Sequence, residues 1–94
     1  MEKFIIDEAV DELSTVNDMM RWAVSHFNGA GLFYGHGTDN AWDEAVQLIL
    51  PTLNLTPMLS EEIRAAQLTR SERQQVADMV ARRVDERIPA PYLT

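Results

Sequence analysis

The sequence predicts an all-α fold, a small bundle of four or five helices, on the basis of three observations. Apolar residues recur at three- and four-residue spacing through most of the chain, helix-capping residues precede these apolar runs, and no segment shows a convincing strand alternation. The chain has 94 residues, of which 46% are hydrophobic and 24% are charged. This size and composition predict one domain with a packed core, without repeats or a low-complexity linker.

The first two helices are expected close together near the start of the chain. Residues 2–13 have an apolar face that consists of Ile5, Ile6, Ala9, Val10 and Leu13. Thr15, followed three residues later by Asp18, resembles a capping signal for a second helix of about fifteen residues. The apolar stripe of that helix consists of Val16, Met19, Met20, Ala23, Val24 and Phe27. Gly29 or Gly31 is expected to end it.

A third helix is predicted after an interrupting loop. Either Asp39 or Asn40 can cap its N-terminus. The buried side of this helix is expected to consist of Trp42, Ala45, Val46, Ile49 and Leu50. The helix should end around residues 50–54, because Pro51 limits its length or kinks its last turn.

The last two predicted helices begin with clear capping residues. Ser60 can cap a short helix at 60–66. Thr69 and Glu72 then have the spacing of a capping box, and Pro89 marks the end of the helix that follows. The apolar stripe of this last helix consists of Val76, Met79, Val80, Val84 and Ile88.

The charge of the chain is uneven. The formal net charge is -7, and residues 1–44 carry nine acidic and two basic side chains, whereas residues 45–94 carry six of each. An acidic surface repels phosphate backbones and attracts basic partners. We therefore expect no direct nucleic-acid binding, and we expect either a basic protein partner or an acidic surface that only serves solubility.

The sequence also bears on the cellular compartment. It contains no cysteine, which excludes disulfides and thiolate chemistry and fits a reducing compartment. No window approaches the roughly 20 consecutive apolar residues of a membrane span, and the first residues lack the pattern of a signal peptide. We expect a cytoplasmic protein without a membrane partner.

The segment 32–45 is the least ordinary part of the sequence, because an aromatic pair and a glycine-flanked histidine interrupt the helical pattern. The imidazole of His36 is expected to project from a loop, where partners and ligands often bind. A metal site that joins His36 with His26 and Asp39 or Asp43 lacks the close ligand spacing of recognisable sites, so no metal is expected. The alternative role is structural, with the loop pinned by the packing of Phe33, Tyr34 and Trp42.

The residues themselves predict no catalysis. The chain has no nucleophile elbow and no glycine-rich phosphate loop. Asp43 and Glu44 are adjacent and so do not face each other on a helix, which makes them helix N-terminal charges rather than an acid/base pair. Arg82, Arg83 and Arg87 suit the negative pole of the last helix.

Several stretches resemble a known family. Residues 83–94, RVDERIPAPYLT, resemble the interdomain junction of the HemK/PrmC/PrmB family of glutamine methyltransferases. EAVDEL, MMRWAVSHF and YGHGTDNAWDEAVQLILP look like the PrmB-type branch of that family, so the resemblance covers nearly the whole chain. It implies that residues 1–94 form a helical substrate-recognition domain, with 88–94 as the extended start of the connection to a Rossmann-like domain that binds S-adenosylmethionine.

The resemblance also implies a substrate, a glutamine side-chain amide of the large-subunit ribosomal protein L-three. The family signature Asn-Pro-Pro-Tyr and a glycine-rich cofactor loop are absent here, so no catalytic or cofactor-binding residue is expected and the chain alone should be inactive. Contact with the substrate protein is expected at Tyr34, His36, Asp39, Asp7, Asp11 and Glu12. Contact with the catalytic domain is expected at Arg87, Pro89 and Tyr92. The alternative is a stand-alone acidic helical module for protein interaction.

Overall fold

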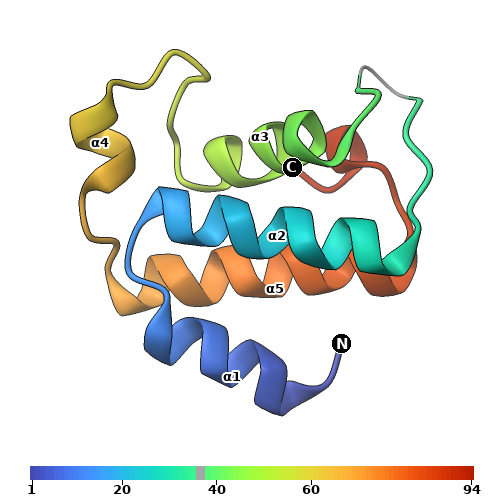
Figure 1. Cartoon of the computed structure of the whole chain (residues 1–94), viewed down its shortest axis with the longest axis horizontal. Coiled ribbons are helices and arrows are strands. Elements are labelled where there is room, and N and C mark those ends of the chain that lie inside the picture. Colours follow the sequence, from blue (N-terminus) through green and yellow to red (C-terminus); the bar gives the residue numbers. More distant parts are fainter. Residues whose placement is uncertain (36–37) are drawn as a thin grey trace.

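The computed structural model describes residues 1–35 and 38–94. These residues contain five α-helices, one short 3-10 helix and no β-strand, which confirms the all-α prediction (Figure 1). The elements are α1 (Lys3–Glu12), α2 (Val16–Ala30), α3 (Ala41–Thr52), α4 (Glu61–Ala65), α5 (Arg70–Glu86) and the 3-10 helix η1 (Ala90–Tyr92). None of the helices described is long and apolar enough to cross a membrane.

Helices α2 and α5 lie side by side at the centre of the bundle (Figure 1). Helix α1 packs against α5 on one side of this central pair, and α3 packs against both helices on the other side. Helix α4 contacts α2, and η1 returns to contact α3. The bundle therefore has three layers, with α1 and α3 separated by the α2–α5 pair.

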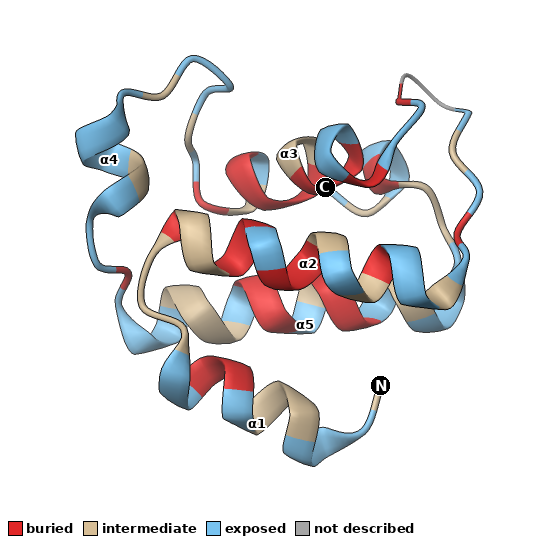
Figure 2. Ribbon diagram, in the orientation of Figure 1, coloured by how far each residue is buried: buried red, intermediate tan, exposed pale blue. Residues whose placement is uncertain are grey.

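The core fills the space between the layers, and the buried faces of α2, α3 and α5 turn toward one another (Figure 2). Phe27, Met19 and Leu48 are among the largest side chains that are completely buried. The apolar stripe predicted for α2 is confirmed, because five of its six members are buried and the sixth, Val24, is partly buried and packs against the core. Methionine and aromatic side chains thus serve packing in this part of the chain.

Both predicted capping boxes are present. Thr15 Oγ1 accepts a hydrogen bond from the Asp18 backbone N–H, and the Asp18 carboxylate accepts one from the Thr15 N–H, each at 3.1 Å. Thr69 and Glu72 make the same reciprocal pair at 3.2 and 2.9 Å. These bonds satisfy N–H groups that a helix N-terminus leaves without partners, which explains where α2 and α5 begin.

The shorter helices also begin at predicted residues. Ser60 Oγ accepts the Ile63 N–H at 3.3 Å, and Asn40 Oδ1 accepts the Asp43 N–H at 2.8 Å. Of the two capping residues that the sequence allowed, Asp39 and Asn40, it is therefore Asn40 that caps α3. Pro51 lies inside the last turn of α3, so it marks the end of that helix without preventing the final turn.

Gly31, not Gly29, ends helix α2. Gly31 adopts the left-handed conformation with φ of 61°, and its N–H donates to the Asn28 carbonyl at 3.2 Å. Gly29 lies within the helix, as its second-last residue. A left-handed residue at this position is a common helix C-cap, and glycine adopts it without strain.

Alanine substitutions at Gly29 and Gly31 should change the free energy of unfolding in opposite directions. We expect Gly31→Ala to lower the free energy of unfolding by about 1–2 kcal/mol, because an L-residue is strained in the left-handed region. Gly29→Ala should raise it by about 0.5–1 kcal/mol, because alanine suits a helix interior better. No heavy atom lies within 4 Å of either added methyl group, so packing does not obscure the comparison. Urea titration measures both variants, and effects of the same sign would contradict the assignment.

Two aromatic predictions are wrong. Trp42, expected on the buried side of α3, is 47% exposed, and Phe33, expected to pin the loop from below, is 91% exposed. The face of α3 that packs on the central helices contains Ala41, Ala45 and Leu48, which leaves Trp42 at its edge. Tyr34 alone of the three pinning residues packs against the core as predicted.

The segment after α5 is not extended as predicted. Helix α5 ends at Glu86, and Arg87 follows in the left-handed conformation with φ of 56°, so the predicted stripe stops before Ile88. Pro89 then precedes the turn of η1, in which Ala90 is completely buried. The end of the described chain therefore packs on α3 rather than projecting away from it.

Candidate functional site

The most deeply buried polar contact is an ion pair between α3 and α5. Arg83 Nε and Nη2 both donate to Glu44 Oε2, at 3.0 and 2.7 Å. The side chains of Arg83 and Glu44 are only 1% and 2% exposed. Arg83 Nη2 also donates to the Phe33 carbonyl at 3.0 Å, so the pair fixes the connection before α3 as well as the two helices.

The sequence did not predict this pair. Glu44 and Arg83 lie in the terminal turns of their helices, as expected, but they are not surface charges that merely suit the helix dipole. Glu44 lies three residues after Ala41 and four before Leu48, which places it on the buried face of α3. Arg83 lies three residues after Val80 on the buried face of α5. The signal available in the sequence was one acidic residue on the apolar stripe of α3 and one basic residue on the apolar stripe of α5.

Tyr34 lies close to the buried ion pair. Its ring packs against the core, and its hydroxyl is enclosed without a hydrogen-bond partner among the described residues. Burial raises the pKa of Tyr34, and the Glu44 carboxylate raises it further. Any partner that contacts Tyr34 in this conformation therefore meets its ring and not its hydroxyl.

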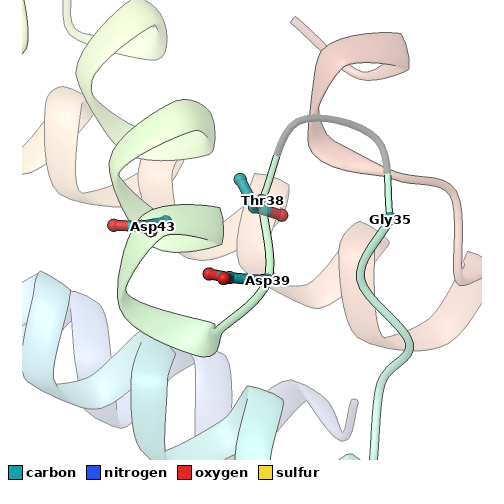
Figure 3. Close-up of a pocket in the computed structure, with 4 residues that line it drawn as sticks. All are labelled: Gly35, Thr38, Asp39 and Asp43. Carbon is teal, nitrogen blue, oxygen red and sulfur yellow. The ribbon is translucent and has the colours of Figure 1, made fainter.

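A polar pocket of about 440 Å³ opens where the loop meets α3. It is lined by Gly35, Thr38, Asp39 and Asp43 (Figure 3). Asn40 Nδ2 donates to the carboxylates of Asp39 and Asp43, at 2.8 and 3.0 Å. Both acidic side chains of the pocket are thus already engaged by the residue that caps α3.

His36, the histidine predicted at the centre of this loop, lies outside the described residues. Among residues 1–35 and 38–94, no three His, Asp or Glu side chains gather in a way that could hold a metal ion. His26 lies on α2 and packs edge-on against Trp22, with 4.9 Å between the ring centroids.

His26 should make stability depend on pH. Burial lowers the pKa of His26 below 6.5, and the positive charges of Arg21 and the N-terminus add to this effect. The unfolded chain therefore binds the proton more readily, so this contribution to stability is complete above about pH 6.5 and falls as the pH drops through the folded-state pKa. We expect the melting temperature to fall between about pH 7.5 and 5.5, and His26→Gln to reduce that fall. Thermal melts of both proteins test this, and identical pH slopes would contradict it.

The acidic residues of α1 divide into two sets. Asp7 pairs with Lys3 at 2.7 Å, and Asp11 pairs with Arg70 of α5 at 2.8 Å. Glu8 and Glu12 make no ion pair or hydrogen bond within the described part of the chain.

Glu8 and Glu12 line a cleft of about 170 Å³ between α1 and α2. The other residues that line it are Ala9, Leu13, Arg21 and Trp22. Of the three α1 acids that the sequence singled out, only Glu12 faces this cleft, and Glu8 was missed. The spacing of four residues between Glu8 and Glu12 was the signal that could have identified the pair.

The two predicted groups of substrate-contact residues are not brought together. The loop before α3 lies on one side of the α2–α5 pair, and α1 lies on the other (Figure 1). Tyr34 and Asp39 therefore belong to a different surface from the acids of α1.

The residues expected to contact a catalytic domain lie where α2, α5 and η1 meet. Arg87 Nη2 donates to the Ala30 carbonyl at 3.0 Å, so this arginine also joins the C-terminal ends of α2 and α5. Pro89 is half-buried, and Tyr92 is exposed on η1.

A third, smaller cavity of about 90 Å³ lies between α2, α3 and the segment around α4. Its lining is mainly apolar and consists of Val16, Met20, Trp42, Val46, Leu50, Pro57, Leu59 and Arg64. The two tryptophans of the chain thus lie at different surfaces, Trp22 at the α1–α2 cleft and Trp42 at this cavity.

Comparison with known proteins gives a consistent result. The chain is 51% identical over 90 residues to the ribosomal protein uL3 glutamine methyltransferase of Neisseria gonorrhoeae. This alignment covers 96% of this chain and 30% of that protein. It is 49% identical over 94 residues to the proteins of the same name from Neisseria meningitidis serogroups A and B. These alignments cover all of this chain and 31% of each relative. The chain thus spans about 30% of the length of these curated relatives. No family model and no solved structure matches it.

Proposed function

We propose that this chain is the helical substrate-recognition domain of a protein methyltransferase that modifies a glutamine side-chain amide of ribosomal protein uL3. The observation that carries the proposal is an identity of 49% over all 94 residues with proteins named for that activity. Because the match covers only 31% of those relatives, we assign the methyl transfer to a different part of the polypeptide.

The residues of this chain support a non-catalytic role. The sequence has neither a glycine-rich cofactor loop nor the Asn-Pro-Pro-Tyr signature. The one fully buried acid that the structure describes, Glu44, is neutralised by Arg83 and lines none of the three pockets described above. We propose S-adenosylmethionine as the methyl donor of the whole enzyme and assign its binding to a part of the polypeptide outside residues 1–94.

Charge supports the choice of partner. A protein that binds ribosomal RNA needs lysine and arginine side chains to neutralise phosphates. The chain described here carries a net charge of -7, all of it in residues 1–44. Attraction between opposite charges accelerates encounter and favours the correct partner.

The candidate contacts lie on opposite sides of the bundle. On the α1 side, the proposed substrate contacts are Asp7, Asp11 and Glu12. On the α3 side, the proposed substrate contacts are Tyr34 and Asp39. His36, which we also propose as a substrate contact, lies outside the described residues. The contacts proposed for the catalytic domain are Arg87, Pro89 and Tyr92, which also lie toward α3. A catalytic domain seated on the α3 side would leave α1 free for the substrate.

Methyl transfer tests the proposed function directly. The full-length polypeptide that contains this chain is incubated with purified uL3 and S-adenosylmethionine bearing an isotopically labelled methyl group. We expect the label on a glutamine side chain of uL3, located by mass spectrometry, and no transfer by residues 1–94 alone. Failure of the full-length polypeptide to label uL3 would overturn the proposal.

A further inference from the structure

We infer that the cleft between α1 and α2 is the docking surface for a basic segment of the substrate protein. The inference rests on the proposed function, because that function supplies the basic partner. The apolar floor of the cleft consists of Ala9, Leu13 and Trp22, and its rim carries Glu8 and Glu12 on one side and Arg21 on the other.

The exposed stripe of α1 along this cleft is unusual for a face that only needs to be soluble. Glu8 and Glu12 are four residues apart and so lie above one another on the helix, where like charges destabilise it. No basic side chain pairs with either of them in the part of the chain that the structure describes. Phe4, one further turn toward the N-terminus on the same stripe, is 65% exposed. Two unpaired carboxylates therefore line the cleft, and an exposed aromatic ring lies one turn away from them on the same stripe of α1.

The cleft has the chemistry to receive a long basic side chain. Its volume is about 170 Å³. The aliphatic part of an arginine or lysine can lie on apolar surface while its charged end stays at the rim, near carboxylates. Trp22 and Leu13 supply that surface, and Glu8 and Glu12 supply the charge.

The other acidic surfaces are more fully neutralised. Asp7 and Asp11 of α1 are paired with Lys3 and Arg70. The carboxylates of the pocket before α3 both accept hydrogen bonds from Asn40. The α1–α2 cleft therefore offers two carboxylates that a basic partner can engage without first breaking a contact within the bundle.

The affinity of the 94-residue chain for purified uL3, measured by calorimetry, tests the inference. We expect the double variant Glu8→Gln/Glu12→Gln to weaken binding about tenfold and to reduce its salt dependence, because two attractive charges are lost. The control is Glu61→Gln/Glu62→Gln, which changes the net charge equally on exposed residues of α4 and should change affinity less than about twofold.

Substitution of Arg21 should change the affinity in the opposite direction. Arg21 lines the cleft together with the acids of α1, and within the described residues its side chain donates a hydrogen bond to Ser25 of the same helix and makes no ion pair. Arg21→Gln should therefore strengthen the binding of a basic segment, by about twofold, because it removes a repulsive charge. Weaker binding of this variant would show that the cleft takes an acidic segment or none, which would overturn the inference.

The two tryptophans allow a test without charge changes. Synthetic peptides that cover uL3 are added to the ¹⁵N-labelled chain, and the indole N–H signals are followed by NMR. The signal of Trp22 should shift with the best-binding peptide while that of Trp42 does not. A shift of Trp42 alone would place the peptide at the cavity beside α4 and overturn the inference.

Failure of this inference can be distinguished from failure of the proposed function. Equal weakening by the two double-glutamine variants would show attraction by net charge alone and would overturn the docking surface. Absence of any binding of uL3 to the chain would overturn it as well. In both cases the methyl-transfer assay on the full-length polypeptide decides the proposed function independently. Thermal melts of each variant confirm that it is folded.

Discussion

Glu44→Gln is expected to lower the free energy of unfolding by about 3–5 kcal/mol, because it leaves one partner of a buried ion pair charged and uncompensated. The Arg83 side chain is only 1% exposed, so water cannot replace the lost carboxylate. A glutamine can still accept one hydrogen bond from Arg83, but it cannot neutralise the guanidinium. Urea denaturation followed by circular dichroism measures the change.

Two further variants show whether charge burial is the cause. Glu86→Gln makes the same substitution in an exposed pair on α5, where Arg82 Nε donates to Glu86 Oε2 at 2.8 Å, and it should leave stability essentially unchanged. Replacement of both buried partners, Glu44→Leu with Arg83→Met, should recover most of the stability lost in Glu44→Gln. If Glu44→Gln unfolds at the same urea concentration as the parent chain, loss of the buried Glu44 charge does not destabilise the fold and the prediction is wrong.

Phe27→Ala, the second substitution with a large expected effect, should lower the free energy of unfolding by about 3–5 kcal/mol. Phe27 is completely buried at the end of α2, and its removal leaves a cavity among side chains of the central layer. Its backbone carbonyl also accepts the N–H of Leu32 at 3.4 Å, so the residue lies where the helix ends and the loop begins. Thermal and urea unfolding of the variant measure the loss.

Phe33→Ala is the matched control. It removes the same aromatic ring six residues later, from a side chain that is 91% exposed, and should change stability by less than about 0.5 kcal/mol. A large loss from Phe33→Ala would support the structural role that the sequence predicted for this ring and would contradict its exposed position.

The helices were predictable because their signals are local. The capping residues Thr15, Ser60 and Thr69 act on N–H groups within three residues of themselves, so their effect is visible in sequence. Burial on α3 was predicted less well. Trp42 lies on the apolar stripe, but whether it is covered depends on the path of the segment around α4, which no local spacing reports.

The candidate site was harder to predict for the same reason. Glu44 and Arg83 are 39 residues apart, and their pairing follows from the packing of α3 on α5. Asp7 and Asp11 appeared in sequence as equivalent to Glu12, yet each has a basic partner in the fold. A single sequence gives the charges on each helix, and the tertiary contacts decide which of them remain free to bind a partner.

The contacts of α5 with the connection between α2 and α3 bear on the order of folding. Arg83 binds the Phe33 carbonyl across 50 residues, and Arg87 binds the Ala30 carbonyl across 57. The connection can reach its final path only when the last long helix has docked, although α2 and α3 are neighbours in sequence. We predict that these contacts form after the transition state, so that loss of the Arg83 side chain speeds unfolding and leaves the folding rate nearly unchanged. The backbone at Ala30 and Phe33 is thus held in place by two arginines near the C-terminal end of α5.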